Sequence, residues 1–422
     1  MGLTARSPCN PVNLCNLWKA VAVFLAAACR GEAPRPAGQL EISTLVDSLR
    51  PQVEEAVGLS FRETPRSAMV SRDDVRRYIV ARLDAEFPPS RRQGVQAAYR
   101  LFGLLPDTLD LEALLLDLYT EQVAGYYDPQ TSTLYGVIGG DASQLRLVLA
   151  HELVHALQHQ YIPLDSIMKQ KRQTDRARAA HAVLEGQATL AQTLVMMPEL
   201  NRAELPSFWE QRTVLNQQQA QMKEFAGAPL WLRETLVFPY LAGADFVRWY
   251  ETRHPGQHPF GRDMPTSTEQ ILHPERYAAG DGPVDVSFLG APLDTVRYED
   301  GLGEFETRLL FQELLQDATG LRATAYAQGW AGDRYQLLGA DLKGLALLWY
   351  TFWDDQAAAD RFERALRQAW QARPRAGRTS RIEAVTIEGK PGVRLVDAPA
   401  DWQSWPRVST VKVGLGIPQS PK

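Results

Sequence analysis

One stretch constrains this chain more than any other: RLVLAHELVHALQHQYI, residues 146–162, has an apolar helical pattern that carries three histidines and one glutamate. On a helix, His151 and His155 lie about 40° apart around the axis and one turn apart along it. Both imidazoles can therefore reach a single metal ion at roughly 2 Å. Glu152 falls at the edge of the same face, where its carboxylate can take a proton from a water on the ion. The pattern predicts a helix from about 143 to 160 that carries a metal site.

The His-Glu-x-x-His spelling is short, and it arises by chance in about 1% of chains of this length. The predicted helix around it, and a predicted strand just before that helix, give the match more weight. A pair of hydrogen-bonded core histidines is the alternative interpretation. The chain does not follow the metzincin pattern, because Tyr161 and Gln158 occupy the positions of its third histidine and its glycine.

A catalytic zinc also needs a third protein ligand and an open position for water. His159 is a poor candidate, because it lies about 80° around the helix from His151 and more than two turns along it. Glu185 is better placed, since it lies on its own predicted helix, 177–197, among small and apolar residues where an unpaired carboxylate is costly to bury. His181, one turn earlier, stays open as a competing ligand or as an outer hydrogen-bond partner.

This arrangement resembles gluzincin metallopeptidases, in which a second helix after His-Glu-x-x-His supplies a glutamate in a Glu-Gly-x-Ala context. Here that context is EGQA, and Gly186 and Ala188 would let the second helix approach the histidine helix closely. The resemblance implies one zinc ion per chain. It assigns metal ligation to His151, His155 and Glu185, and the role of general base to Glu152. Some gluzincins orient a histidine with an aspartate at the position of Thr189, so that role is unassigned here.

Two further segments, GYYDPQTSTLY (125–135) and STEQILHPERY (267–277), are similar to segments of uncharacterised bacterial gluzincin-like proteins. Within the first, TSTLYGVI (131–138) predicts a strand at the edge of a small sheet beside the histidine helix. A peptide substrate could pair with that edge through its backbone. HPGQH (254–258) predicts a solvated loop, because its prolines and glycine prevent a helix.

Peptide hydrolysis also needs a donor for the developing oxyanion. The sequence leaves this role open among Tyr126, Tyr127, Tyr240 and His273.

The expected fold class is mainly α with small β (α+β), with a zincin-like metallopeptidase core, a short edge sheet and the HExxH helix. The chain is expected to divide into an export signal (1–29), a linker (30–39), an N-terminal helical region (40–119), a zincin-like catalytic region (120–345) and a C-terminal α+β portion (346–422). The last portion contains a predicted hairpin at 382–398, and Trp349 and Trp353 are expected in the core.

The N-terminal run LWKAVAVFLAAAC (17–29) is apolar, short and followed by a Pro/Gly-rich tether, which predicts export. The run resembles a bacterial lipoprotein signal, which implies a lipid anchor to the membrane through Cys29. An ordinary signal peptide or a disordered tail is the alternative. Cys9, Cys15 and Cys29 all lie in this leader, so a metal site in the mature protein must use His, Asp and Glu.

A formal net charge of −5 and the lack of a long basic run argue against a nucleic-acid partner. The sequence therefore predicts an exported, envelope-located zinc metallopeptidase acting on peptides or proteins. The alternative is a catalytically inactive zincin-fold envelope binding protein, which the presence of Glu152 disfavours. A further hypothesis treats residues 40–118 as an inhibitory segment that must move before substrate enters.

Overall fold

The computed structural model describes residues 39–139, 142–163, 173–212, 223–290, 294–342, 344–373, 375–405, 408–414 and 416. The predicted export signal, 1–29, lies outside these residues, and so does the predicted linker except for its last residue. The α-helices are α1 (Gln39–Val57), α2 (Arg72–Glu86), α3 (Pro89–Phe102), α4 (Leu111–Gln122), α5 (Ala142–Tyr161), α7 (Thr174–Met196), α9 (Lys223–Gly227), α10 (Leu230–Arg253), α11 (Thr268–Leu272), α12 (Pro274–Ala278), α13 (Gly303–Leu314), α14 (Leu321–Ala327) and α15 (Gln356–Gln371). The strands are β1 (Arg66–Val70), β2 (Gly125–Asp128), β3 (Thr133–Val137), β4 (Asp285–Phe288), β5 (Val296–Asp300), β6 (Trp330–Leu338), β7 (Ala346–Trp353), β8 (Arg378–Ile387), β9 (Lys390–Pro399) and β10 (Val411–Gly414).

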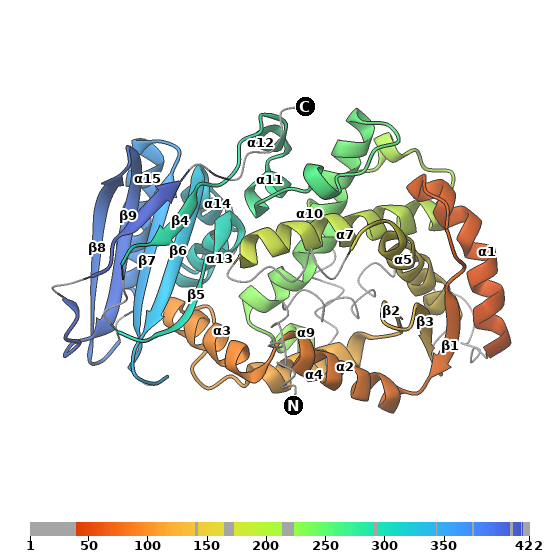
Figure 1. The fold of residues 1–422 in the computed structure, drawn as a ribbon, viewed down its shortest axis with the longest axis horizontal. Coiled ribbons are helices and arrows are strands. Elements are labelled where there is room, and N and C mark those ends of the chain that lie inside the picture. Colours follow the sequence, from red (N-terminus) through yellow and green to blue (C-terminus); the bar gives the residue numbers. More distant parts are fainter. Residues whose placement is uncertain are drawn as a thin grey trace, which may run out of the picture.

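Helices make up most of the molecule, and the strands form three small sheets, which confirms the α+β class. Figure 1 shows the five-stranded sheet β5-β6-β7-β9-β8 at one end, next to α13, α14 and α15. The three-stranded sheet lies at the other end with α1 and α5, and α7 and α10 run between the two ends. Among the described residues, none of the helices has the length and apolar character that crossing a membrane requires.

The three-stranded sheet has the order β1-β3-β2, which corrects the predicted edge position of residues 131–138. β3 is the middle strand: it pairs in parallel with β1 and antiparallel with β2. β1 lies in the region expected to be mostly helical. Its sequence, RSAMV, does not alternate between apolar and polar residues. Its partner strand, β3, is far along the chain, so the sequence contains no hairpin turn that would indicate a strand here. Residues 40–118 therefore complete this sheet and, through α1, part of its core.

The five-stranded sheet contains the predicted hairpin, formed by β8 and β9. The turn falls on Glu388 and Gly389, both with positive φ (51° and 79°), so Lys390 and Gly392 belong to β9 rather than to the turn. β5 and β6 precede residue 345 and β7 to β9 follow it, so one sheet spans that position. Trp349 and Trp353 on β7 are fully buried, as expected for core residues.

α7 and α10 cross at very close range through small residues. A Cβ atom on Gly186 of α7 would overlap the backbone of Gly243 on α10, and a Cβ on Gly243 would overlap the backbone of Ala182. Gly186 thus serves the contact with α10, not the expected contact with the histidine helix. Ala188, by contrast, does pack in the cluster that includes the α5 residues Leu149 and Leu153.

Gly243→Ala is expected to lower the free energy of unfolding by about 1–3 kcal/mol or more, because backbone, unlike a flexible side chain, cannot move aside for the added methyl group. Urea-induced unfolding measures this change. Gly227→Ala is the matched control, since a Cβ there meets nothing within 4 Å. Equal stability of Gly243→Ala and the parent protein would contradict the close crossing.

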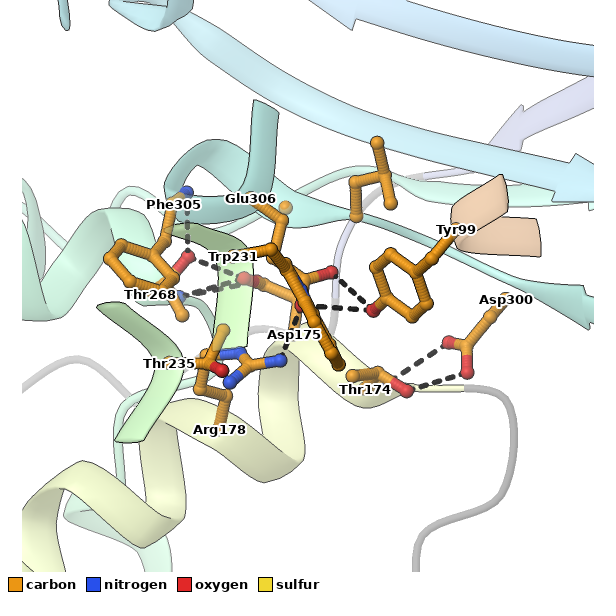
Figure 2. Close-up of polar contacts among 12 residues, drawn as sticks. Tyr99, Thr174, Asp175, Arg178, Trp231, Thr235, Thr268, Asp300, Phe305 and Glu306 are labelled. Atoms are coloured by element: carbon orange, nitrogen blue, oxygen red, sulfur yellow. Dashed lines mark hydrogen bonds and ion pairs between the residues drawn. The ribbon is translucent and has the colours of Figure 1, made fainter. Parts of the chain in front are cut away.

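The first turn of α7 is fixed to the C-terminal half of the chain by buried polar contacts (Figure 2). Thr174 donates to Asp300 from its backbone nitrogen (2.9 Å) and its hydroxyl (2.6 Å). Asp175 accepts hydrogen bonds from the backbone nitrogen and hydroxyl of Thr268 at the start of α11. Burial raises the pKa of Asp175 to about 8. These contacts hold the N-terminal end of the helix on which Glu185 lies.

Glu306 on α13 is the centre of a second group of contacts to the same helix. Its carboxylate pairs with Arg178, one turn further along α7, and accepts hydrogen bonds from Tyr99 (2.7 Å) and from the indole of Trp231 (2.8 Å). Glu306 is 0% exposed, so these donors replace water entirely. Figure 2 shows Tyr99, Trp231 and Arg178 converging on it from α3, α10 and α7.

Candidate metal centre

α5 carries the HELVH motif, and its bounds, Ala142–Tyr161, agree with the helix predicted at about 143–160. One face is fully apolar: Leu153 and Val154 are 0% exposed and pack in a cluster with Ile42 and Val46 of α1. This packing turns His151 and His155 toward α7. Local periodicity thus sets the helix, and the apolar face sets its rotation.

Three ligand atoms converge between α5 and α7. His151 Nε2 lies 3.0 Å from Glu185 Oε2, His155 Nε2 lies 3.3 Å from the same oxygen, and the two Nε2 atoms are 3.2 Å apart. Ligands at 2.0–2.1 Å in a tetrahedral arrangement are about 3.3 Å from one another. The three residues are 1–2% exposed. This buried group could hold a metal ion, and its spacing fits three corners of a tetrahedron.

The electrostatics also suit a cation. Burial lowers the pKa of His151. Burial acts in the same direction on His155, but the Glu185 carboxylate outweighs it and raises the pKa of His155 to about 9. For Glu185, burial favours the neutral form, but the charge on His155 and hydrogen bonds from the histidines hold its pKa well below the usual range. Glu185 is therefore an ionised carboxylate facing two imidazoles.

The other two candidate histidines do not join the ligand group. His181 Nε2 lies 3.1 Å from Glu185 Oε1, the oxygen that faces away from the ligand group, which makes it an outer partner of the carboxylate. His159 contacts the hydroxyl of Tyr127 through Nδ1, at 2.9 Å. Of the described residues, only His151, His155 and Glu185 form a metal-binding group of at least three.

Glu152 is 0% exposed and lies beside the ligand group without being part of it. The backbone nitrogen of Tyr127 on β2 donates a hydrogen bond to Glu152 Oε2 at 2.9 Å. Because β2 is an outer strand, its unpaired backbone side faces this carboxylate. The charge on Glu152 is also one of the causes that raise the pKa of His155.

Of the four candidates for oxyanion donor, one side chain lies next to a candidate metal ligand. The ring centroid of Tyr240 on α10 is 5.9 Å from that of His151. Burial, followed by the charges of Glu185 and Glu152, raises the pKa of Tyr240 well above its usual range, so the hydroxyl keeps its proton.

The remaining three candidates are directed elsewhere. The ring of Tyr126 stacks on those of Tyr78 and Tyr135. The hydroxyl of Tyr127 is used by His159, and His273 bonds Glu304 through Nε2 at 2.9 Å.

Behind His155 lies a chain of polar side chains that the sequence analysis missed. His155 Nδ1 contacts Gln158 Oε1 at 2.9 Å, and Gln158 Nε2 donates to Gln187 Oε1 at 3.0 Å. Gln187 Nε2 in turn donates to Glu251 Oε1 at 3.3 Å. His258 Nδ1 also contacts Glu251 Oε1, at 2.8 Å. The prediction of a solvated loop at 254–258 was thus wrong for His258, whose side chain is only 10% exposed.

The family and the solved structure that resemble this chain each match part of it. Residues 293–400 match a domain family described as a domain of unknown function (DUF8575), which covers the C-terminal sheet and none of the ligands. No curated protein matches the sequence. A crystal structure from Chloroflexus aurantiacus, described as "a putative hydrolase with a novel fold", is 18% identical, covers 62% of this chain and 95% of its own, and has a TM-score of 0.35. A TM-score at this level does not establish a shared fold, so the zincin-like core stays a prediction.

Proposed function

We propose that this chain is a zinc-dependent peptidase of gluzincin type, with His151, His155 and Glu185 as the ligands of one zinc ion. The observation that carries the proposal is the mutual spacing of the three ligand atoms, 3.0–3.3 Å, next to a buried glutamate that is not a ligand. A structural metal site has no need of that fourth group. When bound, zinc lowers the pKa of a water to about 7 and polarises the scissile carbonyl.

Glu152 acts as the general base in this proposal. Its carboxylate takes the proton of the attacking water and later delivers it to the leaving amine. The hydrogen bond from the backbone of Tyr127 fixes one carboxylate oxygen, which limits the side chain to one orientation.

A peptide is the favoured substrate because of the position of β2. The outer side of this strand faces Glu152, as the direction of the Tyr127 N–H shows. An extended chain lying along β2 would pass its own backbone carbonyls near the general base, and it would find the Tyr127 N–H already donated to Glu152. The proposal also includes export and a lipid anchor through Cys29, which would place the protein in the cell envelope.

Tyr240 supplies the donor for the developing oxyanion in this proposal. Its hydroxyl also hydrogen-bonds Glu185, so Tyr240→Phe is compared with the parent protein at saturating zinc, where kcat is expected to fall by about 10²–10³-fold. The phenolic O–H is lost while the ring packing against His151 is kept. Steady-state kinetics on a cleaved peptide measures kcat, and elemental analysis confirms that zinc is bound. Tyr250→Phe, a buried tyrosine on the same helix, is the control. A kcat equal to that of the parent protein would remove Tyr240 from the reaction.

The proposal as a whole is tested by incubating the zinc-loaded full chain with unfolded casein and a mixed peptide library, and by reading new termini with mass spectrometry. New termini that appear with zinc and disappear with a chelator support a peptidase. One bound zinc with no cleavage would instead favour the inactive envelope binding protein.

A further inference from the structure

We infer that Glu251 is a positioning residue that prepares His155 for metal binding, acting through the side chains of Gln187 and Gln158. The inference rests on the proposed metal site and adds a part of it that lies on a third helix. The chain of contacts runs from α5 through α7 to α10, and each of its links is 2.9–3.3 Å long.

Glu251, at the end of this series of contacts, determines which group donates in each hydrogen bond. A carboxylate can only accept, so the Gln187 atom that faces Glu251 must be the NH₂ group. The carbonyl of Gln187 then faces Gln158 and accepts from its NH₂ group. The carbonyl of Gln158 is thereby left for His155, whose Nδ1 must donate to it. A neutral imidazole with its proton on Nδ1 keeps the Nε2 lone pair for the metal.

Burial prevents these hydrogen bonds from reversing their direction. Gln158, Gln187 and Glu251 are 1%, 2% and 6% exposed, so water cannot easily replace a mismatched partner. A flipped amide would set two donors or two acceptors against each other, which is unfavourable at a buried position. Gln158 Nε2 also donates to the backbone oxygen of Leu184 at 3.0 Å, which favours the same orientation.

Glu251 is itself anchored by two cationic or imidazole partners, Arg202 and His258. Arg202 forms an ion pair with Oε2, and the same guanidinium donates to the backbone oxygen of Ala56 at the end of α1. His258 Nδ1 contacts the other oxygen, Oε1, which also accepts from Gln187, and the nitrogens of His258 and Gln187 are 3.1 Å apart. The carboxylate is thus held in place while it sets the direction of the two amides.

Glu251→Gln tests the inference, because an amide can donate as well as accept, so His258, which also lies next to the Gln187 NH₂ group, no longer has a fixed acceptor beside it. Loss of an outer partner of a metal ligand typically weakens metal binding by about 10–100-fold, and this is the expected fall in zinc affinity. Competition with a chromophoric chelator measures it on the full chain. Glu234→Gln is the matched control: Glu234 is another buried glutamate of α10 paired with an arginine, Arg308, outside the chain of amides.

A second variant separates the effect of hydrogen-bond direction on zinc affinity from the effect of general damage to the fold. Gln187→Glu, added to Glu251→Gln, moves the carboxylate one step toward His155 with the same charge and nearly the same volume. The carboxylate at position 187 would again accept from Gln158, so zinc affinity is expected to recover most of what Glu251→Gln loses. Unchanged affinity in Glu251→Gln would overturn the inference. Equal losses in Glu251→Gln and Glu234→Gln, or a double variant without recovery, would do so as well.

Failure of the proposed zinc site would be recognised separately, since the parent protein would then bind no zinc. In that case the ring ¹⁵N shifts of His155 decide the matter, read at a pH at which the shifts show that the ring is neutral. The proton is expected on Nδ1 in the parent protein and on a mixture of both nitrogens in Glu251→Gln. The same distribution in both proteins would overturn the inference.

Discussion

Replacing Glu152 with glutamine is expected to lower kcat for peptide cleavage by about 10²–10⁴-fold while one zinc ion stays bound. The amide cannot take a proton from the attacking water, but it has the size of the carboxylate and can still accept the hydrogen bond from Tyr127. Glu152 is not one of the three converging ligands, so the metal site is expected to survive. Steady-state kinetics and elemental analysis on the same preparation measure kcat and the zinc content per chain.

Glu234→Gln controls for the loss of one buried negative charge, and its activity is expected to equal that of the parent protein. Full activity of Glu152→Gln would show that another group is the base. Loss of zinc together with loss of activity would place Glu152 in the metal site itself, and the assignment of ligands would then have to change.

His151→Ala and Glu185→Ala are each expected to remove zinc. Either change leaves two of three protein ligands, and loss of a mere outer partner already weakens binding by about 10–100-fold, so a fall of more than about 100-fold is expected. Removal of Glu185 also removes the negative charge that favours a cation between the two histidines. Zinc per chain after dialysis, measured by elemental analysis, reports the result.

His159→Ala is the matched control, because His159 lies on the same helix but contacts Tyr127 instead of the ligand group. It is expected to keep one zinc per chain. If the parent protein keeps no zinc after loading, or if His151→Ala keeps it, the three-ligand site is wrong, and hydrogen-bonded core histidines become the better interpretation.

The parts of the fold that could be predicted are those with a local signal. A capping box of Ser71 and Asp74 begins α2, with both reciprocal hydrogen bonds present, and its spacing can be read directly from the sequence. The apolar period gave α5 within a residue or two, and alternation gave the β8–β9 hairpin. β1 was missed because parallel pairing with β3 joins segments that are distant along the chain and requires no turn signal.

The candidate site divides in the same way. A spacing of four residues on one helix dictates that His151 and His155 share a face. The small and apolar residues around Glu185 marked it as a candidate third ligand. The contact between Gly186 and α10, and the link from Gln187 to Glu251, depend on how α7 crosses α10. These residue pairs carry no local pattern, so a single sequence could not reveal them.

The anchoring of α7 bears on the order in which the molecule folds. His151 and His155 meet as soon as one helix forms, but Glu185 reaches them only when α7 has docked. The contacts that hold the start of α7 join residues 126 and 128 positions apart, Thr174 with Asp300 and Arg178 with Glu306. Such distant contacts form late, because long loops must close first. A nascent chain would therefore carry both histidines and Glu185 before it carried residues 300 and 306, which hold the start of α7 in its final place.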